Sequence, residues 1–312
     1  MNELFVIPQS PNSLLAKVAD GIISIVRTID IPYNSISKIT NNNLIVSLCL
    51  ELEELRICDI SGQLITKKTH SPFKALAVKQ NTAYLGGEYD NNDWREQGEM
   101  FSIIDLDMAE IELKNIDLPV KVIEGKRIDD ILVLDNKLIL VDDVVFPKYL
   151  FEYDISIPNN PVHIRTKDLP SNRPNETIIK GDINKDWLVL FSETSHMGGW
   201  SQHISVSGKT YGHLSLYYTW EQKKLGVINP FFYVDICLAA NWLLILTNDG
   251  LGYLDLKKSI SRYNFKKITT KCLSFEKLIK TSAMDVIGVN ENNYELINVE
   301  EKFQSDWRSM RL

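Results

Sequence analysis

The chain has 312 residues, of which 44% are hydrophobic and 24% are charged, a composition typical of a folded soluble protein rather than a disordered one. The net charge is −7, without a concentrated Lys/Arg block, which gives little electrostatic basis for binding nucleic acid. No stretch approaches the roughly 18 consecutive apolar residues that would cross a bilayer. The first residues lack the pattern of a secretory signal. We therefore expect a cytoplasmic protein with neither nucleic-acid nor membrane partners.

A sequence pattern that predicts two consecutive strands recurs seven times along the chain. A short polar opener leads into an apolar strand, and a second strand follows that usually ends in an aspartate and a turn. Each polar opener and its apolar run together cover residues 2–7, 43–46, 81–85, 136–140, 186–190, 241–245 and 285–287. The strand ends are Asp20, Asp59, Asp105, Asp154 and Asp255, with Ser205 and Asn298 in the equivalent places. An interval of roughly 40–50 residues, built from strands, predicts a β-propeller.

Grouping four strands into each blade divides the chain into successive units. The first blade opens at Asn2 and lacks its innermost strand, and the others cover about 35–70, 73–115, 127–167, 177–218, 232–268 and from 275 onward. We expect an all-β, seven-bladed propeller that forms a single domain over residues 1–312, with a six-bladed ring as the alternative. Because an open ring would expose strand edges, we expect the termini to close it, with the tail 302–312 as the candidate segment.

The fourth unit carries a resemblance to a known repeat. Residues 138–142 read Leu-Ile-Leu-Val-Asp, and residues 153–162 end a strand in an Asp-Ile-Ser turn followed by prolines. This resembles the LVIVD-type propeller repeat, and more distantly the WD-repeat propellers, whose Trp-Asp and Gly-His dipeptides are absent from the corresponding strand ends. The resemblance implies a propeller that serves as a binding platform, without assigning the partner.

Aromatic and basic residues gather on the loops between the second and third strands of blades three to five, and on the connectors between blades. In a four-stranded blade these segments emerge on one face of the ring. Aromatic and arginine side chains on polar loops are typical anchors of a recognition surface, although they could instead cap their own blades. We therefore expect a non-catalytic protein-interaction scaffold. The predicted partner-binding residues are Tyr89, Trp94, Arg95, Phe146, Lys148, Tyr149, His196, Trp200 and Trp220.

An alternative function uses carboxylates near the ring axis. Several oxygen ligands converging there could hold Ca²⁺, as in a metal-dependent hydrolase or lactonase acting on a small molecule. The acids do not occupy an evident repeated position, and Lys180, Lys277 and Lys280 would also face the hub and repel a cation, so no metal is expected. The candidate ligands, if a metal binds, are Asp129, Asp130, Asp142, Asp143 and Asp235.

Three further features favour structure over chemistry. Each strand-end aspartate is expected to accept hydrogen bonds from its own turn. The string from His196 to His203 contains paired glycines and predicts a plain turn, with a mobile ligand-binding loop as the alternative. The cysteines at 49, 58, 237 and 272 show no metal-ligand spacing. We expect buried free thiols, with Cys49 and Cys58 as the only pair placed to meet across adjacent strands.

Overall fold

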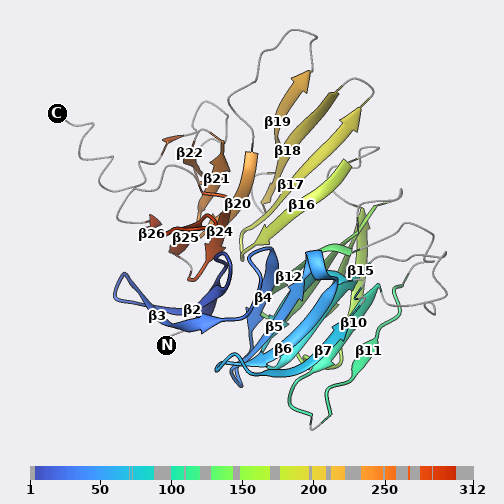
Figure 1. Cartoon of the computed structure of the whole chain (residues 1–312). Coiled ribbons are helices and arrows are strands. Elements are labelled where there is room, and N and C mark those ends of the chain that lie inside the picture. Colours follow the sequence, from blue (N-terminus) through green and yellow to red (C-terminus); the bar gives the residue numbers. More distant parts are fainter. Residues whose placement is uncertain are drawn as a thin grey trace.

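Seven antiparallel sheets surround a common centre in the computed structural model (Figure 1). The structure describes residues 4–69, 71, 73–87, 100–108, 110–119, 128–142, 148–168, 176–196, 199–208, 212–221, 233–248, 250–257, 266–267, 275–282 and 284–299. Five of the sheets have four strands and two have three, and each sheet uses consecutive strands of the chain. The prediction of a seven-bladed propeller is therefore confirmed.

The strands follow the predicted units closely. Blades 1 and 2 contain β1 (Leu4–Ile7), β2 (Ser13–Ala19), β3 (Ile22–Ile29), β4 (Ser35–Ile39), β5 (Leu44–Cys49), the 3-10 turn η1 (Leu50–Leu52), β6 (Glu54–Asp59) and β7 (Leu64–Thr69). Blades 3 and 4 contain β8 (Phe73–Lys79), β9 (Thr82–Gly87), β10 (Phe101–Asp105), β11 (Leu113–Asn115), β12 (Ile128–Leu134), β13 (Lys137–Asp142), β14 (Tyr149–Asp154) and β15 (Val162–Asp168). Blades 5 to 7 contain β16 (Glu176–Ile183), β17 (Trp187–His196), β18 (Gly199–Gly208), β19 (Gly212–Glu221), β20 (Tyr233–Ala239), β21 (Trp242–Thr247), β22 (Gly250–Asp255), β23 (Lys266–Lys267), β24 (Lys277–Lys280), β25 (Asp285–Val289) and β26 (Tyr294–Asn298).

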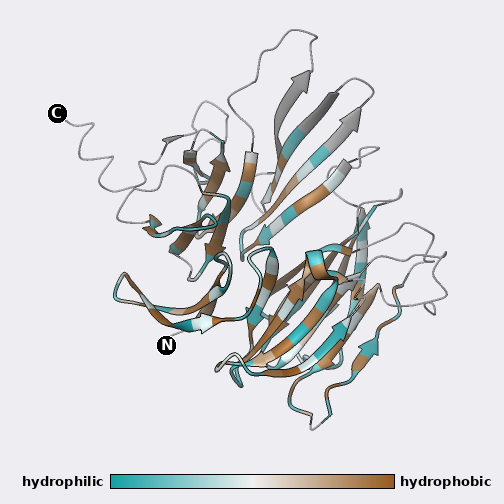
Figure 2. Ribbon diagram, in the orientation of Figure 1, coloured by the Kyte–Doolittle hydropathy of each residue, from teal (hydrophilic) through white to brown (hydrophobic). Residues whose placement is uncertain are grey.

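The hydrophobic core lies between neighbouring blades, which explains the continuous apolar runs of the second strands. Leu243 and Ile245 of β21 are buried and pack with Val189 and Phe191 of β17. A strand covered on both faces does not need to alternate apolar and polar residues. Figure 2 shows these hydrophobic segments concentrated in the inner strands, while the outer strands β7 and β11 carry more hydrophilic residues.

Close approach between blades also requires a glycine. A Cβ atom on Gly86 of β9 would lie 2.6 Å from Cγ2 of Ile128, which begins the first strand of the next blade. That separation is far shorter than any ordinary carbon contact, so a side chain at this position would displace β12. The glycine therefore sets how tightly blades 3 and 4 pack.

Four of the five strand-end aspartates, Asp59, Asp105, Asp154 and Asp255, accept hydrogen bonds from their own turns, as predicted. Asp20 instead takes a φ of 52° and accepts none from the described residues. One carboxylate oxygen of Asp59 accepts from the backbone N–H of Ser61 at 2.7 Å and of Gln63 at 3.0 Å. Asp154 accepts from the N–H of Ser156 at 2.8 Å. The pKa of the Asp59 carboxyl and that of the Asp154 carboxyl lie below the usual value, chiefly because of the side-chain hydrogen bond from the serine. Gly62 completes the Asp59 turn with a φ of 84°, a conformation that glycine adopts without steric cost.

Blade 1 and blade 7 meet to close the ring. Ile7 and Ala16 pack with Ile287 and Val289 in one buried cluster. The Gln9 side chain donates to the carbonyl of Asn290 at 2.9 Å, and the N–H of Ser10 donates to the carbonyl of Glu291 at 3.0 Å. Side-chain packing and two loop contacts thus join these blades among the described residues. The predicted closing segment 302–312 lies outside them.

The cysteine prediction is confirmed where the structure describes the residues. Cys49, Cys58 and Cys237 are buried free thiols, and Cys272 lies outside the described residues. Cys49 and Cys58 are not register partners, because Cys49 lies opposite Glu54 and Cys58 lies opposite Ile45. Within the described part of the chain, no helix has the length and apolarity that a bilayer crossing requires.

Candidate functional site

Blade 5 is longer than the blades around it. Strands β17, β18 and β19 each have 10 residues, whereas β13 and β14 of blade 4 and β21 and β22 of blade 6 each have 6. The three strands extend well beyond the neighbouring sheets (Figure 1). The end of these strands that extends beyond the ring carries the loop from β17 to β18. The chain also leaves β19 towards blade 6 at this end. We call residues 194–201 and 219–221 the blade-5 tip.

The tip brings together three of the predicted partner-binding residues. Trp200 of β18 lies opposite Trp220 of β19 and opposite Ser195 of β17. His196 ends β17 and lies opposite Gly199. The string from His196 to His203 is therefore the end of an extended hairpin, and His203 lies deep in β18. The sequence placed these residues on loops, whereas the structure places their backbone in strands.

The lower half of the same strands belongs to the ring. Among the described residues of blade 5, those packed against blade 6 are Trp187, Val189, Phe191, Ile204 and Val206. Above them a polar layer begins, in which Ser192, Gln202 and His203 are buried. The Gln202 amide donates to the Glu193 carboxylate at 2.9 Å. Among the described side chains, the apolar ones packed against blade 6 lie below this layer, and the backbone of the tip lies beyond it.

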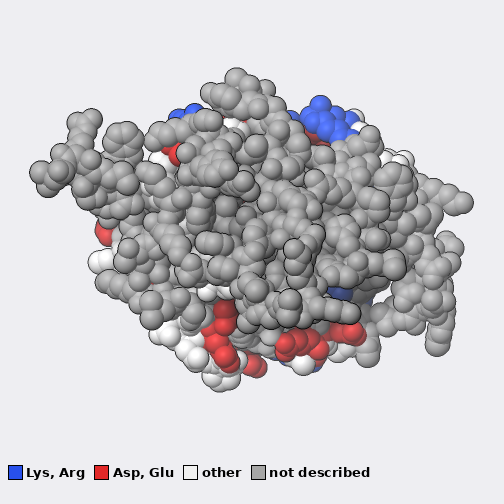
Figure 3. Space-filling model, turned by 90° about the horizontal axis from the view of Figure 1, so that it is seen from above, with Lys and Arg blue, Asp and Glu red and all other residues white. Residues whose placement is uncertain are grey.

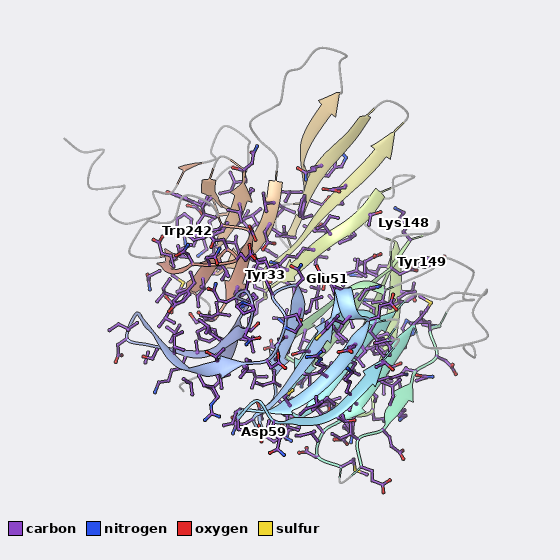
Figure 4. The ribbon with its side chains drawn as sticks, in the orientation of Figure 1. Tyr33, Glu51, Asp59, Lys148, Tyr149 and Trp242 are labelled. Carbon is purple, nitrogen blue, oxygen red and sulfur yellow. The ribbon has the colours of Figure 1, made fainter. Side chains whose placement is uncertain are left out.

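The other predicted partner-binding residues either lie outside the described residues or are at least partly buried. Tyr89, Trp94, Arg95 and Phe146 lie outside the described residues. Lys148, immediately before β14, is buried with 1% of its surface exposed. Tyr149 is partly buried, and its ring centroid lies 5.7 Å from that of Phe151 in the core. Figure 4 shows Lys148 and Tyr149 side by side at this end of blade 4.

A central cavity of about 910 Å³ runs along the ring axis. The first strands of blades 2 to 7 form its wall, together with Val6, Pro8 and Ser13 of blade 1. We call it the hub channel. Its charged lining residues are Lys38, Lys74, Asp129, Asp130, Lys180, Asp182, Asp235, Glu276, Lys277 and Lys280.

Three aspartates of the hub channel make the same pair of hydrogen bonds. Asp130 accepts from the N–H of Ile131 at 2.8 Å and from the N–H of Gly181, in the next blade, at 2.6 Å. Asp182 accepts in the same way from Ile183 at 2.8 Å and Leu238 at 2.7 Å. Asp235 accepts from Ile236 at 2.7 Å and Leu278 at 2.6 Å. Each carboxylate therefore joins its own first strand to that of the following blade.

This arrangement corrects an expectation about the acids. Asp129 and Asp130 lie inside β12. Asp130 and Asp235 do occupy a repeated position. Each directly follows the register shift in the first strand of its blade. In blade 5 the residue at this position is Lys180. The repetition escaped the sequence because insertions of different length separate the strands.

The remaining candidate metal ligands lie apart from this set. Asp142 ends β13 and is fully buried outside the hub channel lining, and Asp143 lies outside the described residues. Among the residues that the structure describes, no group of three or more His, Cys, Asp or Glu side chains is arranged to hold a metal ion.

Lysines neutralise part of the hub charge, as the sequence suggested. The Lys180 ammonium lies 2.8 Å from an Asp235 oxygen, and the Lys280 ammonium lies 3.5 Å from an Asp182 oxygen. Burial alone would lower the pKa of Lys180, but the attraction of Asp235 reverses the effect and raises it. Burial also raises the pKa of the Asp130 carboxyl to about 6, despite its two N–H donors and the nearby Lys180 and Lys38.

A second cluster lies at the mouth of the hub channel on the tip side of the ring, where Figure 4 shows Tyr33 and Glu51 near the centre. The Tyr33 hydroxyl hydrogen-bonds to the Glu276 carboxylate, and the Asn34 amide donates to the Glu51 carboxylate. The Lys277 ammonium lies 4.5 Å from the centroid of the Tyr33 ring. Sequence reasoning missed this cluster, because 243 residues separate Tyr33 from Glu276.

Charges of both signs reach the surface on the tip side. Figure 3 shows described Asp and Glu side chains along the lower margin of this view and Lys and Arg side chains near the upper margin. No single sign dominates the described part of this face.

Comparisons with known proteins identify the fold. No family model matches the chain, and no curated protein matches it in sequence; the resemblance to LVIVD-type repeats thus rests on the residues alone. The structure is similar to apo AztD from Citrobacter koseri, with a TM-score of 0.54, 11% identity and coverage of 96% of this chain and 92% of that one. Streptogramin B lyase has a TM-score of 0.50, 15% identity and coverage of 94% and 93%.

A third similar structure is the extracellular domain of a hybrid two-component system from B. thetaiotaomicron, with a TM-score of 0.54 and 12% identity. The similarity covers 95% of this chain, which spans 38% of the length of that one. These neighbours are β-propeller-like proteins and include both binding proteins and an enzyme. At this level of identity they show the fold and leave the function open.

Proposed function

We propose that the protein is a non-catalytic recognition module that holds a protein partner at the blade-5 tip. The observation that carries the proposal is the length of β17, β18 and β19, each of 10 residues. The ring does not need this length, because blades 4 and 6 close with strands of 6 residues at the same positions. A rigid extension beyond a closed scaffold is a common way to present contact residues.

The residues gathered at the tip are suited to protein recognition. Trp200 and Trp220 are register partners, and His196 ends the neighbouring strand. Tryptophan is enriched among the few residues that contribute most of the binding energy at protein interfaces. A sheet also holds such residues more firmly than a loop does, which lowers the entropy lost on binding. The loops of blades 3 and 4, with Trp94 and Phe146, would extend the same surface.

The alternative, a metal-dependent hydrolase at the hub, has less support from the geometry. Asp130, Asp182 and Asp235 each use their oxygens to accept two backbone N–H bonds. Lys180 and Lys280 lie against two of these carboxylates. A divalent cation would have to replace those donors and displace the lysines, which is costly in a buried site.

A deletion tests the proposal while keeping the fold. Thr194 and Ser201 are register partners, so residues 195–200 can be replaced by Asn-Gly, the dipeptide preferred in two-residue hairpins. The partner would first be identified by capture with the unmodified protein, and its affinity then measured by calorimetry with both purified proteins. We expect the deletion, and the Trp220→Ala variant, to weaken binding at least tenfold.

Ile157→Ala provides the matched control, because Ile157 is 61% exposed in a turn on the opposite face of the ring. It should bind the partner like the unmodified protein. Unchanged affinity in the tip deletion, with thermal unfolding showing an intact fold, would overturn the proposal. Calcium titration during thermal unfolding tests the alternative, because a cation that binds the native state raises the unfolding temperature.

A further inference from the structure

Among the charged residues of the hub channel, the bridging aspartates and the lysines without an ion-pair partner come from different blades. The aspartates that bridge neighbouring blades come from β12, β16 and β20 of blades 4 to 6. Three lining lysines come from β8, β4 and β24 of blades 3, 2 and 7. Within the described part of the chain, these lysines, Lys74, Lys38 and Lys277, have no carboxylate at ion-pairing distance. Lys180 and Lys280, by contrast, are paired.

Lys38 is the most informative residue among these three lysines. It lies on β4 and lines the hub channel, and no described residue accepts a hydrogen bond from its ammonium group. Burial, and secondarily the charge of Lys180, lowers the pKa of Lys38, while Asp130 and Asp182 act in the opposite direction. The Lys38 side chain is nonetheless exposed within the channel, so it is not packed against other side chains. Its ammonium group is therefore open to an anion that enters the channel.

Lys277 is held in place without being neutralised. Its ammonium donates to the Tyr33 carbonyl at 3.3 Å and lies over the Tyr33 ring. Burial lowers the pKa of Lys277, although Asp235 and Glu276 oppose the shift. The Glu276 carboxylate itself accepts a hydrogen bond from the Tyr33 hydroxyl. Lys277 is therefore oriented at the channel mouth with its charge available.

Partly exposed apolar residues form some of the remaining wall. They include Ile36, Val78, Val133, Val234 and Ile279. Ile179 also lines the cavity and is 47% exposed, so the channel presents apolar surface to its contents. The volume of about 910 Å³ lies within the range of roughly 300–1,000 Å³ that is usual for small-molecule sites. The cavity therefore offers room for an apolar body beside its unpaired ammonium groups.

We propose that the hub channel binds a small organic anion, with a carboxylate head at the exposed ammonium group of Lys38 and an apolar body against the aliphatic wall. The site is separate from the blade-5 tip, and neither proposal depends on the other. The aspartates of blades 4 to 6 do not compete for the lysines, because backbone N–H groups hold them in place. They also disfavour entry of the carboxylate on their own side of the channel.

Octanoate, octylammonium and inorganic phosphate serve as probes in calorimetric titrations of the full chain. Octanoate has both features of the proposed ligand, octylammonium keeps the apolar body with the opposite charge, and phosphate keeps the negative charge alone. We expect octanoate to bind at least tenfold more tightly than either of the others. Equal affinity for octylammonium, or tighter binding of phosphate than of octanoate, would overturn the proposal.

Variants locate the binding site. Lys38→Met removes the charge while retaining an unbranched side chain, and we expect it to weaken octanoate binding at least tenfold, while Lys38→Arg retains most of the affinity. Lys185→Met is the matched control, since Lys185 is exposed outside the hub channel. Thermal unfolding verifies that each variant is folded. The proposal fails if octanoate does not bind to the unmodified protein, or binds Lys38→Met and Lys185→Met alike.

Discussion

Blade 2 and blade 5 show what the ring requires and what it only tolerates. In blade 2 the strands have 5 or 6 residues, and the Asp59 turn stops the third strand by local hydrogen bonds. In blade 5 the second, third and fourth strands continue to 10 residues, past the last described apolar side chain that packs against blade 6. The comparison separates a packed half, which stabilises the propeller, from a tip that is available for another task.

The largest expected effect tests the packed half. Phe191 is buried in the core between blades 5 and 6, and we expect Phe191→Ala to lower the free energy of unfolding by about 3–5 kcal/mol. Urea denaturation would measure the change. Ile164→Ala, at an exposed position of β15, should change it by less than about 0.5 kcal/mol. If deletion of the tip were as destabilising as Phe191→Ala, the division of blade 5 would be wrong.

A smaller effect is expected where blades 3 and 4 approach each other. In Gly86→Ala the new methyl group would overlap Ile128, and overpacking of this kind costs about 1–3 kcal/mol. Ile128→Ala removes the closest obstructing atom, Cγ2, and leaves the Cβ of residue 128 at 2.8 Å from the new methyl group. The double variant should therefore lose less stability than the sum of the two single changes. Additive losses in urea denaturation would show that this contact does not set the blade spacing.

The smallest predicted effect concerns pH and the hub. The Asp130 carboxyl has a pKa of about 6 in the fold, above the ordinary value of 3.8 for an aspartate. The folded state therefore binds more protons than the unfolded state between these two pH values. Stability from this group is therefore present below pH about 4 and decreases as the pH rises towards 6. Asp130→Asn should remove this decrease, whatever its effect on total stability.

Urea denaturation at a series of pH values would measure that difference in slope. The tip deletion is the control, because it removes no hub residue and should keep the slope of the unmodified protein. An unchanged slope in Asp130→Asn would assign the titration to another group. The same experiment thus tests whether the blade-5 tip contributes to the pH dependence of stability.

The aspartates show that a role can be predicted from sequence when the hydrogen-bond donors lie close in the chain. The turn function of Asp59 and Asp154 could be predicted, because their donors lie 2 or 4 residues away. The bridging function of Asp130 could not, because its donor Gly181 is 51 residues away in the next blade. Likewise, Lys148 was predicted to contact a partner, and only folding shows that its side chain is buried.

The amino-acid sequence alone determined the repeat and the strands, because each depends on apolar runs and turn residues within a few positions of one another. It left a six-bladed ring open beside the seven-bladed one that the structure shows. Only the tertiary structure decided that β17 to β19 extend beyond the ring, that Tyr33 meets Glu276, and that three lysines face the hub channel without carboxylate partners. These features depend on which blades become neighbours and on where packing between them stops. Ring closure sets both through contacts between residues far apart in the chain.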